Sequence, residues 1–408
     1  MGLFDKLKKD DKAKISCVID IGLLDKAAKD GSDKALPVFE KPFKKRVEEC
    51  WDNFLKEEHV LRELIDGKAG QQAVSAKMAE LLSPAFAETF AEVGYNGSKY
   101  ELTLCLEGSR TRLFSRAYFK DHAPSEVLQH WDILVGRQYK GSVEQLAIGL
   151  GGSTVKASDI KVWNEWDGGR TKMSLYCEAI VPLLSENPDV AYSIAYIMLD
   201  QAVGELAEMT YIADLKFLTE PLLAEPLSLG QLMKDFCDHL SATPQQLLDE
   251  KRYIDMFSVY RLQPVTEGPA RLRNDIFGGS CNFLPLLNDF LGGRYDTCDM
   301  LAQDGIGAGF IFFSLDFAGS GKDRAAKILD LRDSVVAALE KNAPDAFLFI
   351  GGATGERFAY IDFLSYDLRE VFRAVRDNAV ELFEKAGVRY AGFAPFRADG
   401  ESVTLLEE

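Results

Sequence analysis

The alternation of apolar and polar residues is clearest over the C-terminal quarter of the chain. Gly309–Phe317 is apolar and then alternating, which is typical of a strand, and Lys322–Lys341 carries an apolar stripe with the period of a helix. The same two periods then predict strand, strand, helix and strand at Ala346–Ile350, Arg357–Leu364, Asp367–Ala386 and Val388–Phe396. This βαββαβ order is that of a ferredoxin-like unit.

Local signals mark the ends of the second of these helices. Asp367 can cap the helix, with Glu370 three residues later, and Gly387 follows the last apolar position of the stripe. We therefore expect a ferredoxin-like core over residues 307–397.

The same order can be assigned a second time, nearer the middle of the chain. Asp167-Gly168-Gly169 is a strong hairpin signal, and Asn187-Pro188 is a strong helix start. Around them we assign strand, helix, two strands, helix and strand to Trp131–Tyr139, Val143–Leu150, Ile160–Trp166, Thr171–Val181, Asn187–Thr210 and Tyr211–Leu218. The fold prediction is thus α+β, with two ferredoxin-like units built on antiparallel sheets.

A helical region precedes these units. Helical stripes cover Pro42–Ile65 and, with an interruption at Pro84, residues 71–93, while Tyr100–Leu106 and Leu113–Phe119 read as a hairpin. Two prolines within Glu220–Pro226 indicate a linker. The predicted domains are an N-terminal helical region (1–98), a first α+β ferredoxin-like unit (99–222) and a second α+β unit (223–408).

The net charge and the cysteine pattern limit the cellular compartments and the binding partners that we expect for this chain. The 408 residues include 47 Lys and Arg against 64 Asp and Glu, a formal net charge of −17, which disfavours nucleic acid and anionic membranes as partners. The seven cysteines are scattered and form no CxxC pair, as expected for reduced thiols. The N-terminus lacks the apolar stretch of a signal peptide, and no run of about 20 apolar residues occurs. We expect an acidic cytoplasmic protein.

No motif predicts a catalytic residue, a metal site or a cofactor. Gly319-Ser320-Gly321-Lys322 follows a strand and opens a helix, but Asp316 and Asp323 stand where a phosphate-binding loop needs Gly and Ser or Thr. The four histidines show no metal-ligand spacing, and no GxSxG or HExxH motif occurs. We expect no cofactor and no metal, and the sequence leaves open whether the protein is an enzyme.

The candidate binding residues are Arg137, Gln138, Trp163, Trp166 and Arg170. If Trp131–Tyr139 is a strand, alternation places Arg137 among apolar side chains, where its guanidinium needs a carboxylate, a carbonyl or a ligand anion. The neighbouring hairpin adds two tryptophans and Arg170, residue types that suit a binding surface. The alternative is that Arg137 pairs with an internal acid and that the tryptophans belong to the core.

A weaker candidate group lies in the C-terminal unit: Arg357, Tyr360 and Asp362. Asp362 shares a strand face with apolar residues and could act as a general acid or base. The alternative is an internal ion pair of Asp362 with Arg357 or Arg397.

Two stretches carry a resemblance to known sequences. Phe119–Gln138 (FKDHAPSEVLQHWDILVGRQ) and Gly351–Asp367 (GGATGERFAYIDFLSYD) resemble segments of uncharacterised bacterial proteins of unknown function. The resemblance implies a bacterial origin and carries no reaction or ligand.

The strands of the C-terminal unit are apolar at both alternation phases, and two helices cover one face of a sheet. The other face must then be covered by the first unit, by the segment Leu227–Gly307, or by a second subunit in a homodimer.

The leading hypothesis is a non-enzymatic binding or regulatory protein with an unknown protein or small-molecule ligand. One alternative is an enzyme whose polar site is assembled from distant segments. A second is a structural interaction partner, such as an immunity-type protein. A polar pocket containing Arg137 would favour a binding protein or an enzyme, whereas an uninterrupted apolar face would favour the structural role.

Overall fold

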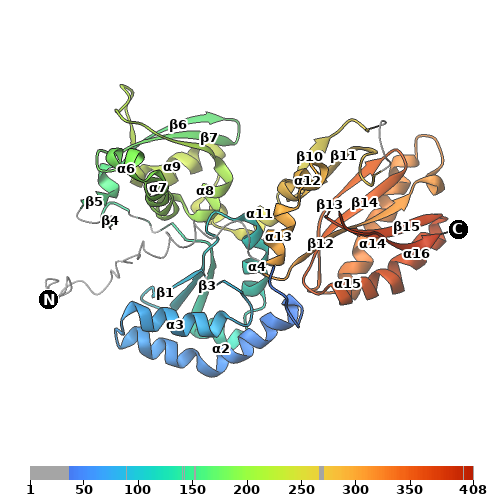
Figure 1. Cartoon of the computed structure of the whole chain (residues 1–408), viewed down its shortest axis with the longest axis horizontal. Helices are drawn as coiled ribbons and strands as arrows, with labels where there is room; N and C mark the ends of the chain where they lie inside the picture. Colours follow the sequence, from blue (N-terminus) through green and yellow to red (C-terminus); the bar gives the residue numbers. More distant parts are fainter. Residues whose placement is uncertain are drawn as a thin grey trace. The chain divides into compact units, whose positions relative to one another are not determined.

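The computed structural model describes residues 36–88, 90–139, 141, 143–150, 153–265, 271–397 and 399–407. These residues form two compact units, whose helices and strands are labelled in Figure 1. The first unit contains residues 57–78 and 90–252, and the second contains residues 36–56, 79–88 and 253–407. The start of the predicted N-terminal region, residues 1–35, lies outside the described residues. The predicted mixture of helices and antiparallel sheets, with a helical region near the N-terminus, is confirmed.

The N-terminal helices are α2 (Phe43–Asp66) and α3 (Gln71–Leu82). Each contributes residues to both units. Helix α3 ends before Pro84, as expected because proline cannot continue the hydrogen-bond ladder. The chain then enters a strand, so the predicted continuation of this helix to residue 93 is wrong.

The first unit contains a three-stranded sheet in the order β1-β2-β3, formed by Ala91–Tyr95, Tyr100–Leu104 and Trp131–Val135. Strands β2 and β3 are parallel, so a crossover must join them. Helices α4 (Arg110–Asp121) and α5 (Ser125–His130) provide it. The predicted strand Leu113–Phe119 is wrong, because these residues lie in α4. A short apolar run fits a buried helix as well as a strand.

A second sheet of the same unit has the order β8-β7-β6-β9. Its hairpin joins β6 (Lys161–Asp167) to β7 (Arg170–Tyr176) through Gly168, which has φ +58°, so the predicted hairpin is confirmed. The remaining strands of the unit are β4 (Ala147–Leu150), β5 (Ser153–Lys156), β8 (Ile212–Phe217) and β9 (Leu227–Ser228). Its remaining helices are α6 (Val181–Glu186), α7 (Pro188–Val203), α8 (Glu205–Tyr211), α9 (Leu229–Leu240) and α10 (Pro244–Leu247), with α11 (Glu250–Ile254) at its end.

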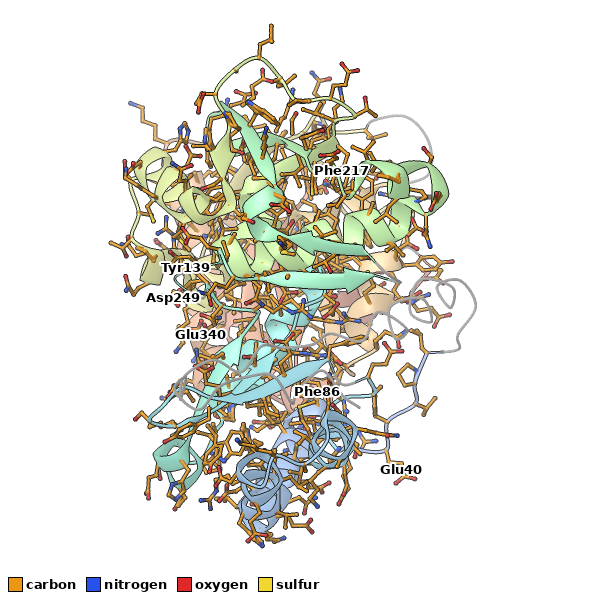
Figure 2. All side chains as sticks on the ribbon, turned by 90° about the vertical axis from the view of Figure 1, so that its left-hand side faces the viewer. Glu40, Phe86, Tyr139, Phe217, Asp249 and Glu340 are labelled. Carbon is orange, nitrogen blue, oxygen red and sulfur yellow. The ribbon has the colours of Figure 1, made fainter. Side chains whose placement is uncertain are left out.

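Helices α7 and α8 pack beside this second sheet. Phe217, labelled in Figure 2, lies at the end of β8. Its ring meets that of Tyr192 on α7 edge-on, with the ring centroids 5.0 Å apart. Asn187 caps α7 and Pro188 opens it, as predicted. The predicted single helix is nevertheless broken in two, because Gly204 has φ +85°.

The ferredoxin-like assignment for the first unit is wrong. Strand β3 belongs to the sheet of β1 and β2, whereas β6, β7 and β8 lie in another sheet, and the predicted helix Val143–Leu150 contains strand β4. Strand β3 also ends at Val135, because Gly136 adopts φ +73°, outside the strand region.

The second unit is built on a seven-stranded sheet with the order β10-β11-β13-β14-β12-β15-β16, antiparallel at every pairing. The strands are Ser258–Arg261, Ile276–Cys281, Gly307–Ser314 (β12), Phe347–Gly355 (β13), Phe358–Ser365 (β14), Tyr390–Pro395 (β15) and Val403–Glu407. The helices are α12 (Leu284–Leu291), α13 (Asp296–Ala302), α14 (Arg324–Asn342), α15 (Leu368–Ala374) and α16 (Val380–Ala386). All six elements predicted for residues 309–396 are present in the predicted order.

The predicted helix ends are also confirmed here. The Asp367 carboxylate accepts hydrogen bonds from the backbone N–H groups of Arg369 (3.0 Å) and Glu370 (3.2 Å), which caps α15. Gly387 ends α16 with φ +79°.

The two faces of this sheet have different covers (Figure 1). Ile311, Phe313 and Phe363 pack in one core with side chains of α14, α15 and α16. On the opposite face Phe310 meets Phe290 of α12 with ring centroids 5.4 Å apart. Three alternative covers were predicted for this second face. The structure shows one of them, the segment Leu227–Gly307, which contains α12.

A buried ion pair lies on the second face. The Arg273 guanidinium donates to both Asp362 oxygens, at 2.5 and 3.0 Å, and both side chains are fully excluded from solvent. Around it, the rings of Phe310, Tyr360 and Phe396 each lie 5.0 Å from the guanidinium carbon. A bidentate pair with stacked aromatic rings is the arrangement that makes a buried arginine tolerable.

The partners predicted for Asp362 are therefore wrong. Arg357 is exposed, and Arg397 pairs with Asp299 and Asp399. The sequence pattern does not identify Arg273, because this residue lies in a loop, with φ +71°, where no periodicity marks a buried side chain.

We predict that Arg273→Met destabilises the protein by roughly 3–5 kcal/mol, because the Asp362 carboxylate would remain buried without its counter-charge. The double variant Arg273→Met, Asp362→Leu should recover most of this loss. Urea unfolding followed by circular dichroism measures both changes.

The control is Arg376→Met, which breaks an exposed pair with Asp377 (2.6 Å) and should change stability far less than Arg273→Met. Equal urea midpoints for Arg273→Met and Arg376→Met would contradict the prediction.

Candidate functional site

The candidate site lies where the parallel strands β2 and β3 of the first unit end. The chain leaves β2 through Glu107 and Gly108, with φ +50° and +67°, before α4 begins. It leaves β3 through Gly136, where a side chain would press against Glu205, 3.4 Å from the position of its Cβ. The carboxyl ends of neighbouring parallel strands are a common place for ligand sites, because both loops converge there.

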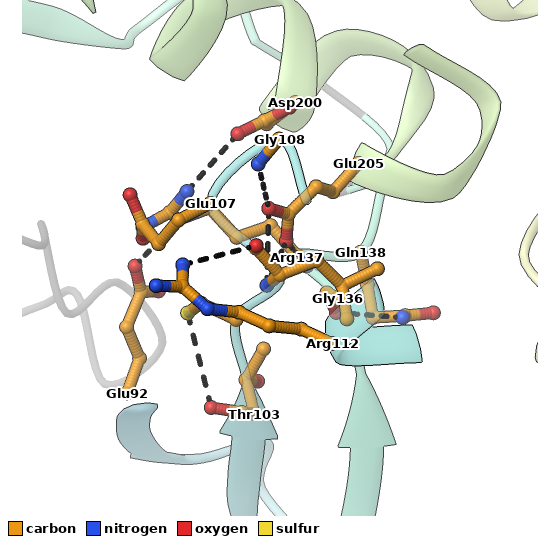
Figure 3. Close-up of polar contacts among 12 residues, drawn as sticks. Glu92, Thr103, Glu107, Gly108, Arg112, Gly136, Arg137, Gln138, Asp200 and Glu205 are labelled. Atoms are coloured by element: carbon orange, nitrogen blue, oxygen red, sulfur yellow. Dashed lines mark hydrogen bonds and ion pairs between the residues drawn. The ribbon is translucent and has the colours of Figure 1, made fainter. Parts of the chain in front are cut away.

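The Glu205 carboxylate holds these two loops together (Figure 3). It accepts the Leu106 N–H at 3.0 and 3.1 Å, the Gly108 N–H at 3.4 Å and the Arg137 N–H at 3.0 Å. In return the Glu205 N–H donates to the Arg137 carbonyl at 2.9 Å. An internal carboxylate thus occupies the loop amides that could otherwise receive an anion.

The Arg137 guanidinium bonds three carboxylates (Figure 3). Its Nε donates to Glu92 (2.8 Å), its Nη2 to Glu107 (2.5 Å) and its Nη1 to Asp200 (3.1 Å). The side chain is 11% exposed. The prediction that Arg137 is at least partly buried and ion-paired, the alternative given above, is confirmed, but its predicted place on a strand face is wrong, because it lies beyond the end of β3.

Beside Arg137 is a cavity of about 540 Å³, which we call the Arg137 cavity. Its charged and polar lining comprises Glu107, Arg110, Arg137, Ser193, Tyr196, Asp200 and Glu208. Its other lining residues are Gly108, Ile197, Met209 and Ile212. The cavity therefore offers both carboxylates and an apolar wall to a small molecule.

Glu208 is the unusual group of this lining. Its side chain is 7% exposed, and among the residues that the structure describes none donates a hydrogen bond to its carboxyl. Burial, and secondarily the negative charge of Glu205, raise its pKa to about 7. Burial and Glu205 also raise the pKa of Asp200, against the opposing effect of Arg137.

The cavity lining has more acidic side chains than basic ones. Three lining carboxylates (Glu107, Asp200 and Glu208) face two lining guanidiniums (Arg110 and Arg137). Glu92 and Glu205, which bond Arg137 from outside the lining, add two more acids. Such a site can accept hydrogen bonds from a cation, and Glu208 can exchange a proton near neutral pH.

The other predicted binding residues have separate partners. Gln138 turns its amide onto the carbonyls of Val135 (3.0 Å) and Gly136 (2.9 Å). The indole N–H of Trp163 donates to the Ala224 carbonyl at 2.9 Å.

Trp166 and Arg170 lie on the β6–β7 hairpin. Trp166 donates to Asp235 (3.1 Å) and stacks on His239, and Arg170 donates to the Ile212 carbonyl (3.2 Å). Of the five predicted binding residues, Arg137 is the one that lines the cavity.

The weaker candidates belong to the second unit's buried network. The Tyr360 hydroxyl donates to Asp275 (2.5 Å) and accepts the Arg273 N–H (2.9 Å). Asp275 also accepts the backbone N–H of Arg357 at 2.9 Å. These bonds give Tyr360 and Asp362 partners within the fold.

The acids of the Arg137 cavity were missed at the sequence level, although two signals were present. Asp200 interrupts an apolar helical run, and Glu205 and Glu208 are three residues apart, which places both on one face of a helix. Neither signal identifies Arg137 as the partner of Asp200, because these two residues are 63 positions apart in the sequence.

Comparisons with known proteins found no significant match to a family model, a curated protein or a solved structure. Among the described residues no three His, Cys, Asp or Glu side chains are placed to hold a metal ion. Within the same part of the chain, no helix has the length and apolarity needed to cross a membrane.

We predict that Arg137→Met destabilises the first unit by roughly 3–5 kcal/mol, because three carboxylates lose their common counter-charge. Tryptophan fluorescence during urea unfolding is a suitable probe, since three of the four tryptophans lie in this unit. Arg170→Met, at an exposed arginine of the same unit, should stay within about 1 kcal/mol of the parent protein. A smaller loss for Arg137→Met than for this control would contradict the prediction.

A separate prediction concerns Glu208→Gln and pH. The unfolded carboxyl loses its proton near its ordinary pKa of 4.5 and the folded one at about 7, so the folded state of the parent loses stability as the pH rises between these values. Above pH 7 the variant should be more stable than the parent by on the order of 3 kcal/mol, and near pH 4 the two should be equal.

The measurement is the urea midpoint at several pH values, with Glu186→Gln, at an exposed residue of α6, as control. A constant difference between Glu208→Gln and the parent across this pH range would show that Glu208 titrates normally.

Proposed function

We propose that this chain is a binding protein for a small polar molecule, which occupies the Arg137 cavity. The observation that carries the proposal is Glu208, a residue only 7% exposed that lines the cavity and whose carboxyl receives no hydrogen bond from the described residues. A carboxyl that lines a cavity and has no donor from the protein is available to a bound molecule, which would supply the donor.

The rest of the cavity supports a small molecule over a protein partner. A volume of about 540 Å³ lies within the range of small-molecule sites. Two helices, α7 and α8, and the loops after β2 and β3 form the walls, and Glu205 fixes these loops by backbone hydrogen bonds. Rigid walls lower the entropic cost of binding.

An enzyme is the second candidate, favoured by one observation. A carboxyl with a pKa of about 7 suits a general acid or base near neutral pH. Conversion of the bound molecule would distinguish this candidate from simple binding.

We further propose that residues 307–395 form a ferredoxin-like core. The supporting observations are the order β13-β14-β12-β15, antiparallel at each step, and the three helices α14, α15 and α16 packed on one face. Strands β10, β11 and β16 then extend this core at its two edges.

A cytoplasmic location is also part of the proposal. All cysteines among the described residues are free thiols, and five of these six are buried. This usage is typical of a reducing compartment.

We predict that Ser193→Phe abolishes the retention of small molecules. Ser193 lines the cavity and its hydroxyl donates to the Asp189 carbonyl of the same helix at 2.8 Å, so a phenyl ring at this position would fill cavity space. The parent protein is incubated with a bacterial metabolite extract, passed over a desalting column, and its retained molecules are identified by mass spectrometry.

Ser334→Phe is the matched control. Ser334 is also a helical serine that donates to the carbonyl four residues before it, at 2.7 Å, but it lies on α14 of the second unit. A molecule retained by the parent and by Ser334→Phe, and lost from Ser193→Phe, is expected. Equal retention by all three proteins, or none by the parent, would overturn the proposal.

A further inference from the structure

The Arg137 guanidinium and the loop amides beside the Arg137 cavity are already committed to internal acids. Each nitrogen of the Arg137 guanidinium bonds a carboxylate. The amides of Leu106, Gly108 and Arg137 bond Glu205. An anionic ligand would have to displace these carboxylates while remaining close to their charge.

Two acids of the lining, in contrast, have acceptor capacity to spare. Glu208 is buried without a donor among the described residues, and Asp200 shares Arg137 with two further carboxylates. Both acids line the cavity. A positively charged donor is the chemistry that would satisfy them, since a charge-assisted hydrogen bond to a carboxylate is stronger than a neutral one.

Part of the remaining lining of the cavity is apolar. Ile197 on α7, Met209 on α8 and Ile212 on β8 form an apolar part of the wall. A ligand that fits both parts has a cationic head and a short alkyl body, and each buried CH₂ group of that body adds to its affinity.

We propose, on the basis of the proposed function, that the Arg137 cavity binds an alkylammonium or alkylguanidinium compound, with its cationic head at Glu208 and Asp200 and its alkyl part against Ile197, Met209 and Ile212. Binding of the cation stabilises the ionised form of Glu208. A Glu208 carboxyl that is protonated before binding therefore releases its proton.

The affinity for the cation should therefore rise with pH and level off above about pH 7, where Glu208 is already ionised. The charged and titratable groups around Glu208 come from several elements: Glu205 on α8, Asp200 and Tyr196 on α7, Glu107 and Arg110 at the start of α4, and Arg137 after β3. Of these, Asp200 also has a raised pKa and would add to the same trend.

The test uses the full chain with isotope-labelled isoleucine and methionine methyl groups, and four probes of equal chain length: n-butylamine, n-butylguanidinium, n-butanol and butyrate. The methyl signals of Ile197, Met209 and Ile212 report on the cavity, and that of Ile328, in the core of the second unit, is the internal control. The two cations should shift the three cavity signals in a saturable way and leave Ile328 unchanged, whereas n-butanol and butyrate should have no saturable effect.

Glu208→Gln keeps the shape of the side chain and should weaken binding of both cations by at least about tenfold. Glu186→Gln, at an exposed residue of the same unit, should leave it within about twofold. Raising the pH from 6 to 8 should tighten cation binding to the parent protein more than to Glu208→Gln.

Saturable binding of n-butanol or butyrate as strong as that of the cations would overturn the cationic ligand and leave the small-molecule function in place. Absence of cation binding, or equal binding by Glu208→Gln, would also overturn it. The proposed function itself is decided separately by the retention of metabolites in Ser193→Phe and Ser334→Phe.

Discussion

A guanidinium that is removed from water needs carboxylates or carbonyls beside it, and in each unit of this chain an arginine of this kind joins distant segments through carboxylates. Arg273 holds Asp362 on a central strand of the second unit, and its backbone N–H bonds Tyr360 of the same strand. Arg137 draws together Glu92 on β1, Glu107 after β2 and Asp200 on α7 in the first unit. In both units the ion pairs join segments that are distant in sequence, so the position of each loop depends on them.

The two arginines differ in how their charge is balanced. Arg273 faces one carboxylate, which both terminal nitrogens bond, and aromatic rings fill the space around it. Both Asp362 oxygens are bonded, which is what a structural ion pair needs, although the Arg273 Nε is buried without a hydrogen-bond partner among the described residues. Arg137 faces three carboxylates beside an open cavity, with Glu205 and Glu208 close by. An excess of buried acid next to an opening is a reason to look for a ligand there and not in the second unit.

The sequence predicted most of the second unit and little of the first. Long segments with a clear period, such as Lys322–Lys341 and Arg357–Leu364, gave the right element, and so did capping signals such as Asp367. Short apolar runs did not give the right element. The run Leu113–Phe119 fits the period of a strand and that of a helix equally well. It is helical because β2 and β3 are parallel, and parallel strands need a crossover connection between them. That pairing is a long-range property, and periodicity contains no information about it.

The candidate site shows the same division. Arg137 was found because a charge within an apolar run needs a partner, whereas its three acids lie in separate segments that no local pattern connects. The prediction grouped the tryptophans of β6 with Arg137 because it placed β3 and β6 in one sheet. This placement is wrong, because β3 belongs to the sheet of β1 and β2, whereas β6 lies in another sheet.

Glu208 links the energetics of the fold to the proposed function. A glutamine at this position would fill the same space without the cost of ionising a buried carboxyl, so stability alone gives no reason for an acid there. The neighbouring Glu205 does not raise the same question, because its backbone hydrogen bonds to the loops after β2 and β3 stabilise its charge. Two acids three residues apart on one helix thus differ: backbone N–H groups satisfy Glu205, which fixes the walls of the cavity, whereas Glu208 receives no hydrogen bond from the described residues, and the proposed ligand would supply one.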